Sequence, residues 1–81
     1  MYKKIHEPIE VMGVYLGRAF APRQFKWRQC RYKVDSVTLR TDYFDGSLKK
    51  RIYAVAVGVN LYRLLFNRES ESWFLEEIWC D

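Results

Sequence analysis

Few residues in this sequence could carry out chemistry, and they lie far apart along the chain. Nucleophilic catalysis needs an activated Ser, Cys or Lys with a base beside it, and the only histidine, His6, stands near the amino terminus. Cys30 stands among Arg28, Arg31 and Lys33, and these cations would make the thiol more reactive if they converged on it. Cys30, however, is expected at the tip of a hairpin, where side chains point into solvent and the cations would not converge on the thiol. We therefore expect no catalytic residue.

Metal and cofactor chemistry is no better supported. His6, Cys30 and Cys80 are scattered, with no CxxC or HxxxH pair. Glu76 and Glu77 are adjacent, so on one strand their side chains would point to opposite faces unless a bulge intervenes. The four glycines are too far apart to form a phosphate-binding loop. The sequence predicts a protein without a metal or cofactor, and it favours a binding role over an enzymatic one.

The charges are distributed unevenly around a net charge of +4. Residues 18–34 contain no acid and six cations: Arg18, Arg23, Lys26, Arg28, Arg31 and Lys33. Residues 69–81 contain no base and five acids: Glu69, Glu71, Glu76, Glu77 and Asp81. Such asymmetry fits an anionic partner for the basic segment. The alternative is that the two tracts lie near each other and neutralise one another.

Aromatic residues interleave with these cations, a combination that suits single-stranded nucleic acid because bases stack while phosphates pair with cations. Phe25 and Trp27 alternate with polar neighbours, so if the two rings face the core, the cations form an exposed face that contacts phosphates only. Binding of that kind is salt-sensitive and blind to sequence. The candidate nucleic-acid-binding residues are Arg23, Lys26, Arg28, Arg31 and Lys33. The cluster of residues 49–51 could extend this face if its loop folds back.

Period-two alternation dominates the chain and positions these residues on strands. We expect a single all-β domain over residues 1–81, an antiparallel meander of about six strands curled into a small barrel or a strongly bent sheet. The strands are expected around residues 9–12, 24–28, 31–35, 51–57, 61–66 and 73–79. Residues 13–22 are expected to form an irregular connection and residues 41–50 a loop. Turns are expected at Gln29–Cys30, Asp45–Gly46 and 58–60, and a bulge or bend near Asp35–Ser36.

The later strands suggest a second kind of partner. Residues 54–57 and 61–66 are apolar on both faces, whereas a half-solvated sheet would alternate. The other wall of a barrel, a short helix or another chain would have to cover the second face. Trp27 and Trp73 are expected to anchor the core. Trp79 follows Ile78, so one of the two should face outward, and Trp79 is the candidate partner contact.

A chain of 81 residues with 49% hydrophobic residues is too apolar for disorder, yet it is marginal in size without a partner. An alternative function is therefore a protein-interaction or self-association module, such as a homodimer. A small-molecule pocket in the mouth of the barrel is a third possibility, although no convergent polar set points to it.

No segment is long and apolar enough for a transmembrane helix, and the amino terminus lacks the apolar region of a secretory signal. We expect a cytoplasmic protein with no membrane partner, in which Cys30 and Cys80 remain reduced.

Motifs across nearly the whole chain carry a resemblance: residues 7–11 (EPIEV), then Pro22-x-x-Phe25-x-Trp27-Arg28-x-x-x-Tyr32-x-Val34, then Tyr53-x-Val55, Tyr62-x-Leu64 and Trp73-x-Leu75-x-x-Ile78-Trp79-x-Asp81. This pattern resembles an uncharacterised bacterial family of small all-β proteins. Similar segments occur near or within ImuB-like proteins, which are related to Y-family polymerases of DNA-damage tolerance. The resemblance implies an all-β fold and nucleic acid, or a nucleic-acid enzyme, as partner. It brings no catalytic residue, and the chain departs from it in having Gln29–Cys30 in place of a glycine at the turn.

Overall fold

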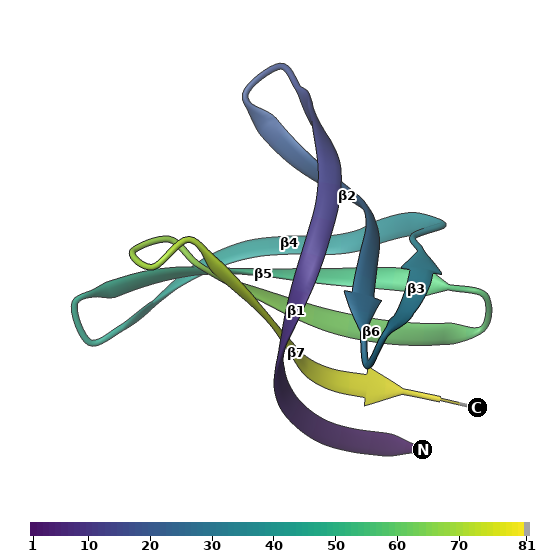
Figure 1. Cartoon of the computed structure of the whole chain (residues 1–81). Coiled ribbons are helices and arrows are strands. Elements are labelled where there is room, and N and C mark those ends of the chain that lie inside the picture. Colours follow the sequence, from purple (N-terminus) through teal and green to yellow (C-terminus); the bar gives the residue numbers. More distant parts are fainter. Residues whose placement is uncertain (81) are drawn as a thin grey trace.

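The computed structural model describes residues 1–80, apart from the side chain of Asp45, and Asp81 of the acidic end lies outside the described residues. The described chain is all-β, and its strands form one antiparallel sheet in the order β3-β2-β1-β7-β6-β5-β4, curled into a half-barrel (Figure 1). The strands are β1 (Tyr2–Leu16), β2 (Ala19–Trp27), β3 (Cys30–Lys33), β4 (Ser36–Asp45), β5 (Leu48–Val57), β6 (Asn60–Asn67) and β7 (Ser72–Trp79). The expected all-β bent sheet is confirmed, with seven strands where about six were expected. No helix that could cross a membrane occurs in the described part of the chain.

The irregular connection expected over residues 13–22 is wrong. β1 continues through Gly13 to Leu16, and the chain reverses at Gly17, whose φ is 67°. Pro22 fits inside β2 because β3 pairs only with residues 24–27. Pro22 therefore lies where β2 is an edge strand and its missing N–H is not needed by a second neighbour. It also lies beside a register shift opposite Gly13, which bends the long hairpin.

The loop expected over residues 41–50 is a second long hairpin. β4 runs to Asp45 and β5 begins at Leu48, so only the tight turn expected at its centre is present, with Gly46 at φ 65°. Asp42 and Arg51 are cross-strand partners and form an ion pair. The polar composition that suggests a loop thus comes from exposed ladder residues that pair across the strands.

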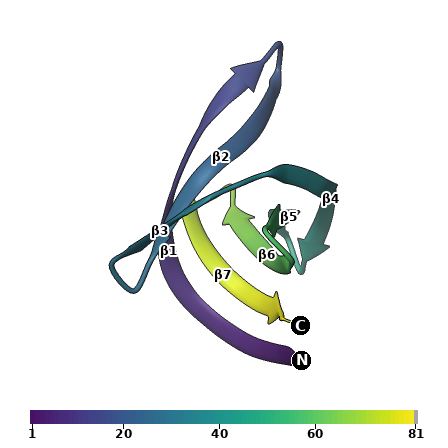
Figure 2. The ribbon, with the colours of Figure 1, turned by 90° about the vertical axis from the view of Figure 1, so that its right-hand side faces the viewer.

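Two connections flank β3. The turn between β2 and β3 lies at Arg28–Gln29, one residue earlier than expected, and Trp27 pairs with Cys30. The break expected near Asp35–Ser36 is present: Val34 donates its N–H to Arg23 in β2, and Asp35 donates its N–H to Ala56 in β5. The chain therefore passes from one edge of the sheet to the other at this point. Figure 2 shows the resulting curvature, with β1 and β7 running side by side along an arc.

The core lies on the concave side of the sheet. Its largest fully buried hydrophobic side chains are Tyr53, Phe25, Leu64, Leu75 and Val55. Trp27 and Trp73 are half-buried and pack against this cluster, as expected. This packing buries aromatic rings from strands at both ends of the sheet, so the half-barrel has one continuous core.

Within residues 1–80 the strands form one sheet, so no second sheet layer covers the outer face of β5 and β6. Leu65 is buried there between its cross-strand partners Ile52 and Phe74. His6 stacks on Phe74, with ring centroids 5.2 Å apart and planes 3° from parallel. Neighbouring side chains of the same face therefore cover Leu65, whereas Leu61 on the same strand remains 41% exposed.

Candidate functional site

Three cations lie on the outer face of the β2–β3 hairpin. Lys26 stands directly opposite Arg31, and Lys33 follows Arg31 two residues along the same strand. On the inner face, Phe25 and Tyr32 stand opposite each other with ring centroids 5.1 Å apart. The alternation along the two strands thus separates the cations from the rings. We call Lys26, Arg31 and Lys33 the basic face.

The basic face lacks anionic partners within the described part of the chain. None of its three residues forms an ion pair or a side-chain hydrogen bond with a described residue. Arg31 and Lys33 are exposed and Lys26 is half-buried. Glu10 stands opposite Lys26 on β1 but forms no ion pair with it. The face therefore presents positive charge to solvent.

Arg28, a candidate from the sequence, is held away from this face. Its Nη2 lies 2.7 Å from Oε2 of Glu7, and its guanidinium carbon lies 4.6 Å from the Trp27 ring centroid. Trp27 donates its indole N–H to Oε1 of Glu7 at 2.9 Å. The hydrogen bonds from Arg28 and Trp27 lower the pKa of Glu7, and Glu7 raises the pKa of Arg28. Arg28 therefore belongs to a local cluster with Glu7 and Trp27.

Arg23 also lies apart from the basic face. It is exposed at the register shift of β2, where its carbonyl accepts the hydrogen bond from Val34. The structure thus brings together three of the five sequence candidates.

The acidic end of the chain does not neutralise the basic face through any described contact. β1 lies between β2 and β7 in the sheet. Glu76 bonds to His6, with 2.7 Å between Oε2 and Nδ1, and Glu77 pairs with Arg63 at 3.2 Å. A register shift beside Glu76 brings both carboxylates to one side of β7. Adjacent residues of a strand normally point to opposite faces, and a bulge of this kind is the exception.

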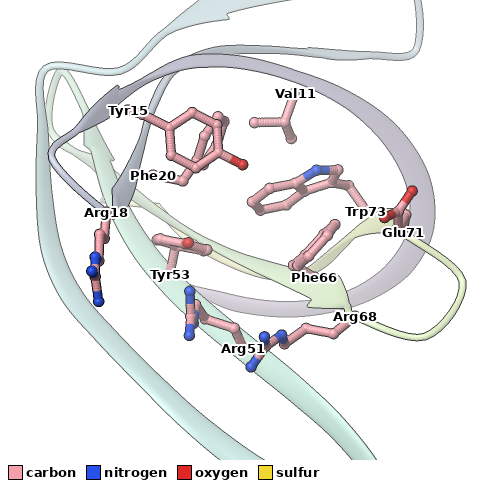
Figure 3. A pocket seen from close by; sticks show the side chains of 10 residues that line it. All are labelled: Val11, Tyr15, Arg18, Phe20, Arg51, Tyr53, Phe66, Arg68, Glu71 and Trp73. Atoms are coloured by element: carbon pink, nitrogen blue, oxygen red, sulfur yellow. The ribbon is translucent and has the colours of Figure 1, made fainter.

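A cavity of about 470 Å³ lies at the open end of the half-barrel, on the concave side. The β1–β2 hairpin, β5 and the β6–β7 turn surround it (Figure 3). Its wall contains five aromatic side chains: Tyr15, Phe20, Tyr53, Phe66 and Trp73. Trp73 is the centre of this group, because its ring lies 4.8 Å from Phe66, 5.4 Å from Tyr53 and 5.7 Å from Phe20. We call this space the mouth cavity.

Three arginines from separate hairpins also line the mouth cavity. Arg18 comes from the β1–β2 turn, Arg51 from β5 and Arg68 from the β6–β7 turn. Arg51 donates Nη2–H to Asp42 at 3.1 Å, and this contact raises the pKa of Arg51. The side chains of Arg18 and Arg68 are exposed and have no described partner. Residues 49–51 belong to β5, so the expectation that a loop carries them back to the basic face is wrong.

This convergent set was missed by the sequence analysis. The available signal was weak: each arginine stands at or near a turn, and each aromatic residue of the wall comes from a different strand. Only the curvature of the sheet brings residues of these hairpins to the wall of one cavity.

At the opposite end, near both termini, an apolar cluster is exposed to solvent. Trp79 is 54% exposed while Ile78 is 5% exposed, so Trp79 is the residue of the two that faces outward. Met1, Val59 and Leu61 line the same shallow hollow as Trp79. The indole of Trp79 lies 5.2 Å from the Tyr2 ring. We call Met1, Val59, Leu61 and Trp79 the apolar end.

The two thiols are free: Cys30 is exposed at the start of β3 and Cys80 is half-buried. Within residues 1–80, no group of three His, Cys, Asp or Glu side chains is placed to hold a metal ion. Comparison with known proteins finds no matching family model, no matching curated protein and no matching solved structure.

Proposed function

We propose that this protein is a non-enzymatic module that binds nucleic acid through the phosphates, using the basic face. The observation that carries the proposal is the direct cross-strand pairing of Lys26 with Arg31. Like charges directly opposite on two strands destabilise the free protein. A polyanion lying across the hairpin would relieve this repulsion, and displaced counterions would add to the free energy of binding.

The geometry of the basic face supports phosphate contacts without base recognition. Arg31 and Lys33 are two residues apart on one strand, which places their backbones roughly 6.6 Å apart. The aromatic rings of this hairpin lie on the opposite side of the sheet, so they are not available to stack on bases at the same surface. Binding should therefore be sensitive to salt and indifferent to base sequence.

Fluorescence anisotropy with a labelled single-stranded oligonucleotide tests this proposal at low and at physiological salt. The variant that combines Lys26→Gln, Arg31→Gln and Lys33→Gln should bind more weakly, and its slope of log affinity against log salt should be smaller by about 2. The matched control combines Lys3→Gln, Lys4→Gln and Arg40→Gln, which removes the same charge from exposed sites elsewhere. Absence of salt-dependent binding by the wild type overturns the proposal, and an equal loss in both variants overturns the assignment to the basic face.

A second candidate function is self-association through the apolar end. The observation in its favour is that four apolar residues gather at one end of a small chain and remain exposed: Met1, Val59, Leu61 and Trp79. Sedimentation velocity over a range of concentrations distinguishes this function from the first. A dimer that Trp79→Ser converts to monomer supports it, whereas a wild-type monomer at the highest concentration excludes it.

A further inference from the structure

The mouth cavity combines a group of aromatic rings with cations that come from separate hairpins. Its wall is aromatic, and its rim carries arginines from three different hairpins (Figure 3). On the β2–β3 hairpin, by contrast, the sheet separates the basic face from the rings, and Arg28, which lies against the Trp27 ring, is already paired with Glu7. A volume of about 470 Å³ lies within the usual range for small-ligand sites.

The aromatic wall is formed before any ligand arrives. Trp73 packs against Tyr53 and Phe66, and Phe20 lies edge-on to Tyr53 with centroids 6.5 Å apart. Tyr53 is fully buried, so the floor of the cavity is anchored in the core. Tyr15 is different: it is 72% exposed and touches the others only through an edge contact with Phe20. A flat ring entering the cavity would thus meet a fixed floor on one side and the Tyr15 ring at the entrance.

The three arginines of the rim differ in whether a carboxylate already pairs with them. Arg51 is held by Asp42, so its charge is largely compensated. Arg18 and Arg68 have no described partner for their guanidinium groups. Guanidinium forks match phosphate oxygens in pairs, and two of them from separate turns can hold one phosphate from two sides.

Among the described residues, Glu71 is the one carboxylate that lines the mouth cavity. In Figure 3 it lies beside Trp73, across the ring cluster from Arg18. It has no described ion-pair partner and its backbone has φ 54°. A carboxylate in that position would repel an anion nearby. Arg68 belongs to the same turn as Glu71, but in Figure 3 its side chain extends away from Glu71 toward Arg51, so the anionic end of a ligand should lie on that side. Glu71 could then accept hydrogen bonds from amino or hydroxyl groups at the other end.

We infer that the mouth cavity binds a nucleoside phosphate, with the base among the rings of Trp73, Phe20 and Tyr15 and the phosphate between Arg18 and Arg68. The ligand is a free nucleotide or the phosphorylated end of a strand. This site lies on the concave side of the sheet and is distinct from the basic face, so either can fail without the other.

The three tryptophans provide a test by ¹H–¹⁵N NMR of the full chain, titrated with AMP, GMP, CMP and UMP. The indole N–H signal of Trp73 should shift on titration, while those of Trp27 and Trp79 stay in place as internal controls. Adenosine should shift Trp73 with at least about tenfold lower affinity than AMP, because it lacks the phosphate. A Trp73 signal that moves neither with millimolar nucleotide nor with a 5′-phosphorylated oligonucleotide overturns the inference, as does an equal shift of all three signals.

Substitutions in the mouth cavity test where the phosphate and where the base of the ligand bind. The double variant Arg18→Gln, Arg68→Gln should lose about tenfold or more in affinity for AMP but keep its affinity for adenosine. The matched control Arg23→Gln, Arg40→Gln should bind AMP as the wild type does. Tyr15→Ser should weaken AMP and adenosine alike, by about tenfold. Unchanged AMP affinity in the Arg18, Arg68 variant overturns the phosphate position.

Oligonucleotides with a terminal phosphate or a terminal hydroxyl separate the two sources of ligand. A Trp73 shift with the phosphorylated strand alone assigns the cavity to strand ends, and a shift with mononucleotides assigns it to the free ligand. The Lys26, Arg31, Lys33 variant should retain the Trp73 shift with AMP, so failure of the basic face and failure of the mouth cavity give different results.

Discussion

The carboxylate of Glu7 accepts a hydrogen bond from the indole of Trp27, 2.9 Å from Nε1 to Oε1. The two residues lie on neighbouring strands, β1 and β2, and Arg28 completes the contact by pairing with the same carboxylate. Trp27 is half-buried against the core, so this one acid ties the β2–β3 turn to the middle of the sheet. A polar contact at the surface thus helps to place a core side chain.

This contact predicts a pH dependence of stability. The pKa of Glu7 in the folded protein is below its ordinary value of 4.5, because Arg28 and Trp27 bond to the charged form. The stabilisation is therefore fully present above pH 4.5 and is lost as the pH falls through the lower, folded pKa. Glu7→Gln should reduce the free energy of unfolding at neutral pH, and the difference from the wild type should shrink in acid. Urea unfolding at neutral and at acid pH measures this difference.

Glu10→Gln is the control for that experiment, because Glu10 is exposed on the same strand and has no described ion pair. It should change the free energy of unfolding by less than about 0.5 kcal/mol at neutral pH. A Glu7→Gln difference that stays constant from neutral to acid pH would contradict the role given to the ionised carboxylate.

Gly13 leads to a second prediction, since a Cβ atom there would lie 2.3 Å from the carbonyl oxygen of Ala21 and 2.6 Å from Cζ of Phe20. The first of these atoms is backbone and cannot move aside cheaply. Gly13→Ala should therefore lower the free energy of unfolding by about 1–3 kcal/mol. Because Phe20 lines the mouth cavity, the indole N–H signal of Trp73 should also shift.

Gly58→Ala is the comparison for Gly13→Ala. A Cβ at Gly58 meets nothing within 4 Å, and the cost comes from its φ of 59° alone. It should destabilise by about 1 kcal/mol and leave the Trp73 signal unchanged. If Gly13→Ala left both stability and the Trp73 signal as in the wild type, the close approach at Gly13 would be refuted.

The sequence was most informative where alternation and burial agree. Phe25 and Lys26 are neighbours, and period-two patterning assigned them to opposite faces, as the structure has them. Trp79 and Ile78 were separated by the same reasoning. These assignments hold because a strand has only two faces and one of them must meet the core.

The sequence was least informative where a residue type serves two purposes. Gly13 and Pro22 suggested an irregular connection, yet they stand opposite each other at a bend inside a hairpin. A pocket in the mouth of the barrel was one of the possibilities, but the residues that line it could not be predicted, for a different reason. Arg18 and Arg68 line one cavity only because the sheet curves, and curvature depends on contacts between distant strands that local pattern does not encode.

The β2–β3 turn gives a third prediction. Arg28 and Gln29 have φ of 50° and 65°, a conformation that L residues adopt at a cost and glycine adopts freely. Gln29→Gly should raise the free energy of unfolding by about 0.5–1 kcal/mol, because the relief of strain exceeds the entropy that glycine loses on folding. Thermal and urea unfolding of the two proteins measure the change.

Cys30→Gly tests the position of that turn. Cys30 is paired with Trp27 in β3, so glycine there should weaken the strand and lower the free energy of unfolding by about 0.5–1 kcal/mol. The opposite pattern, with stabilisation by Cys30→Gly and destabilisation by Gln29→Gly, would place the turn one residue later and contradict the register of the hairpin.

Leucines on adjacent strands give the last prediction, which tests where the core lies. Leu75 on β7 is 0% exposed, whereas Leu61 on β6 is 41% exposed at the apolar end. Leu75→Ala should cost about 2–5 kcal/mol, a large part of the roughly 4–12 kcal/mol available to a domain of this size. Leu61→Ala should cost less than about 1 kcal/mol.

Because Leu75→Ala could unfold the chain, Leu75→Met provides a second measurement and should cost less than about 1.5 kcal/mol. Equal costs for the two alanine variants would mean that the concave face of the sheet is not the core.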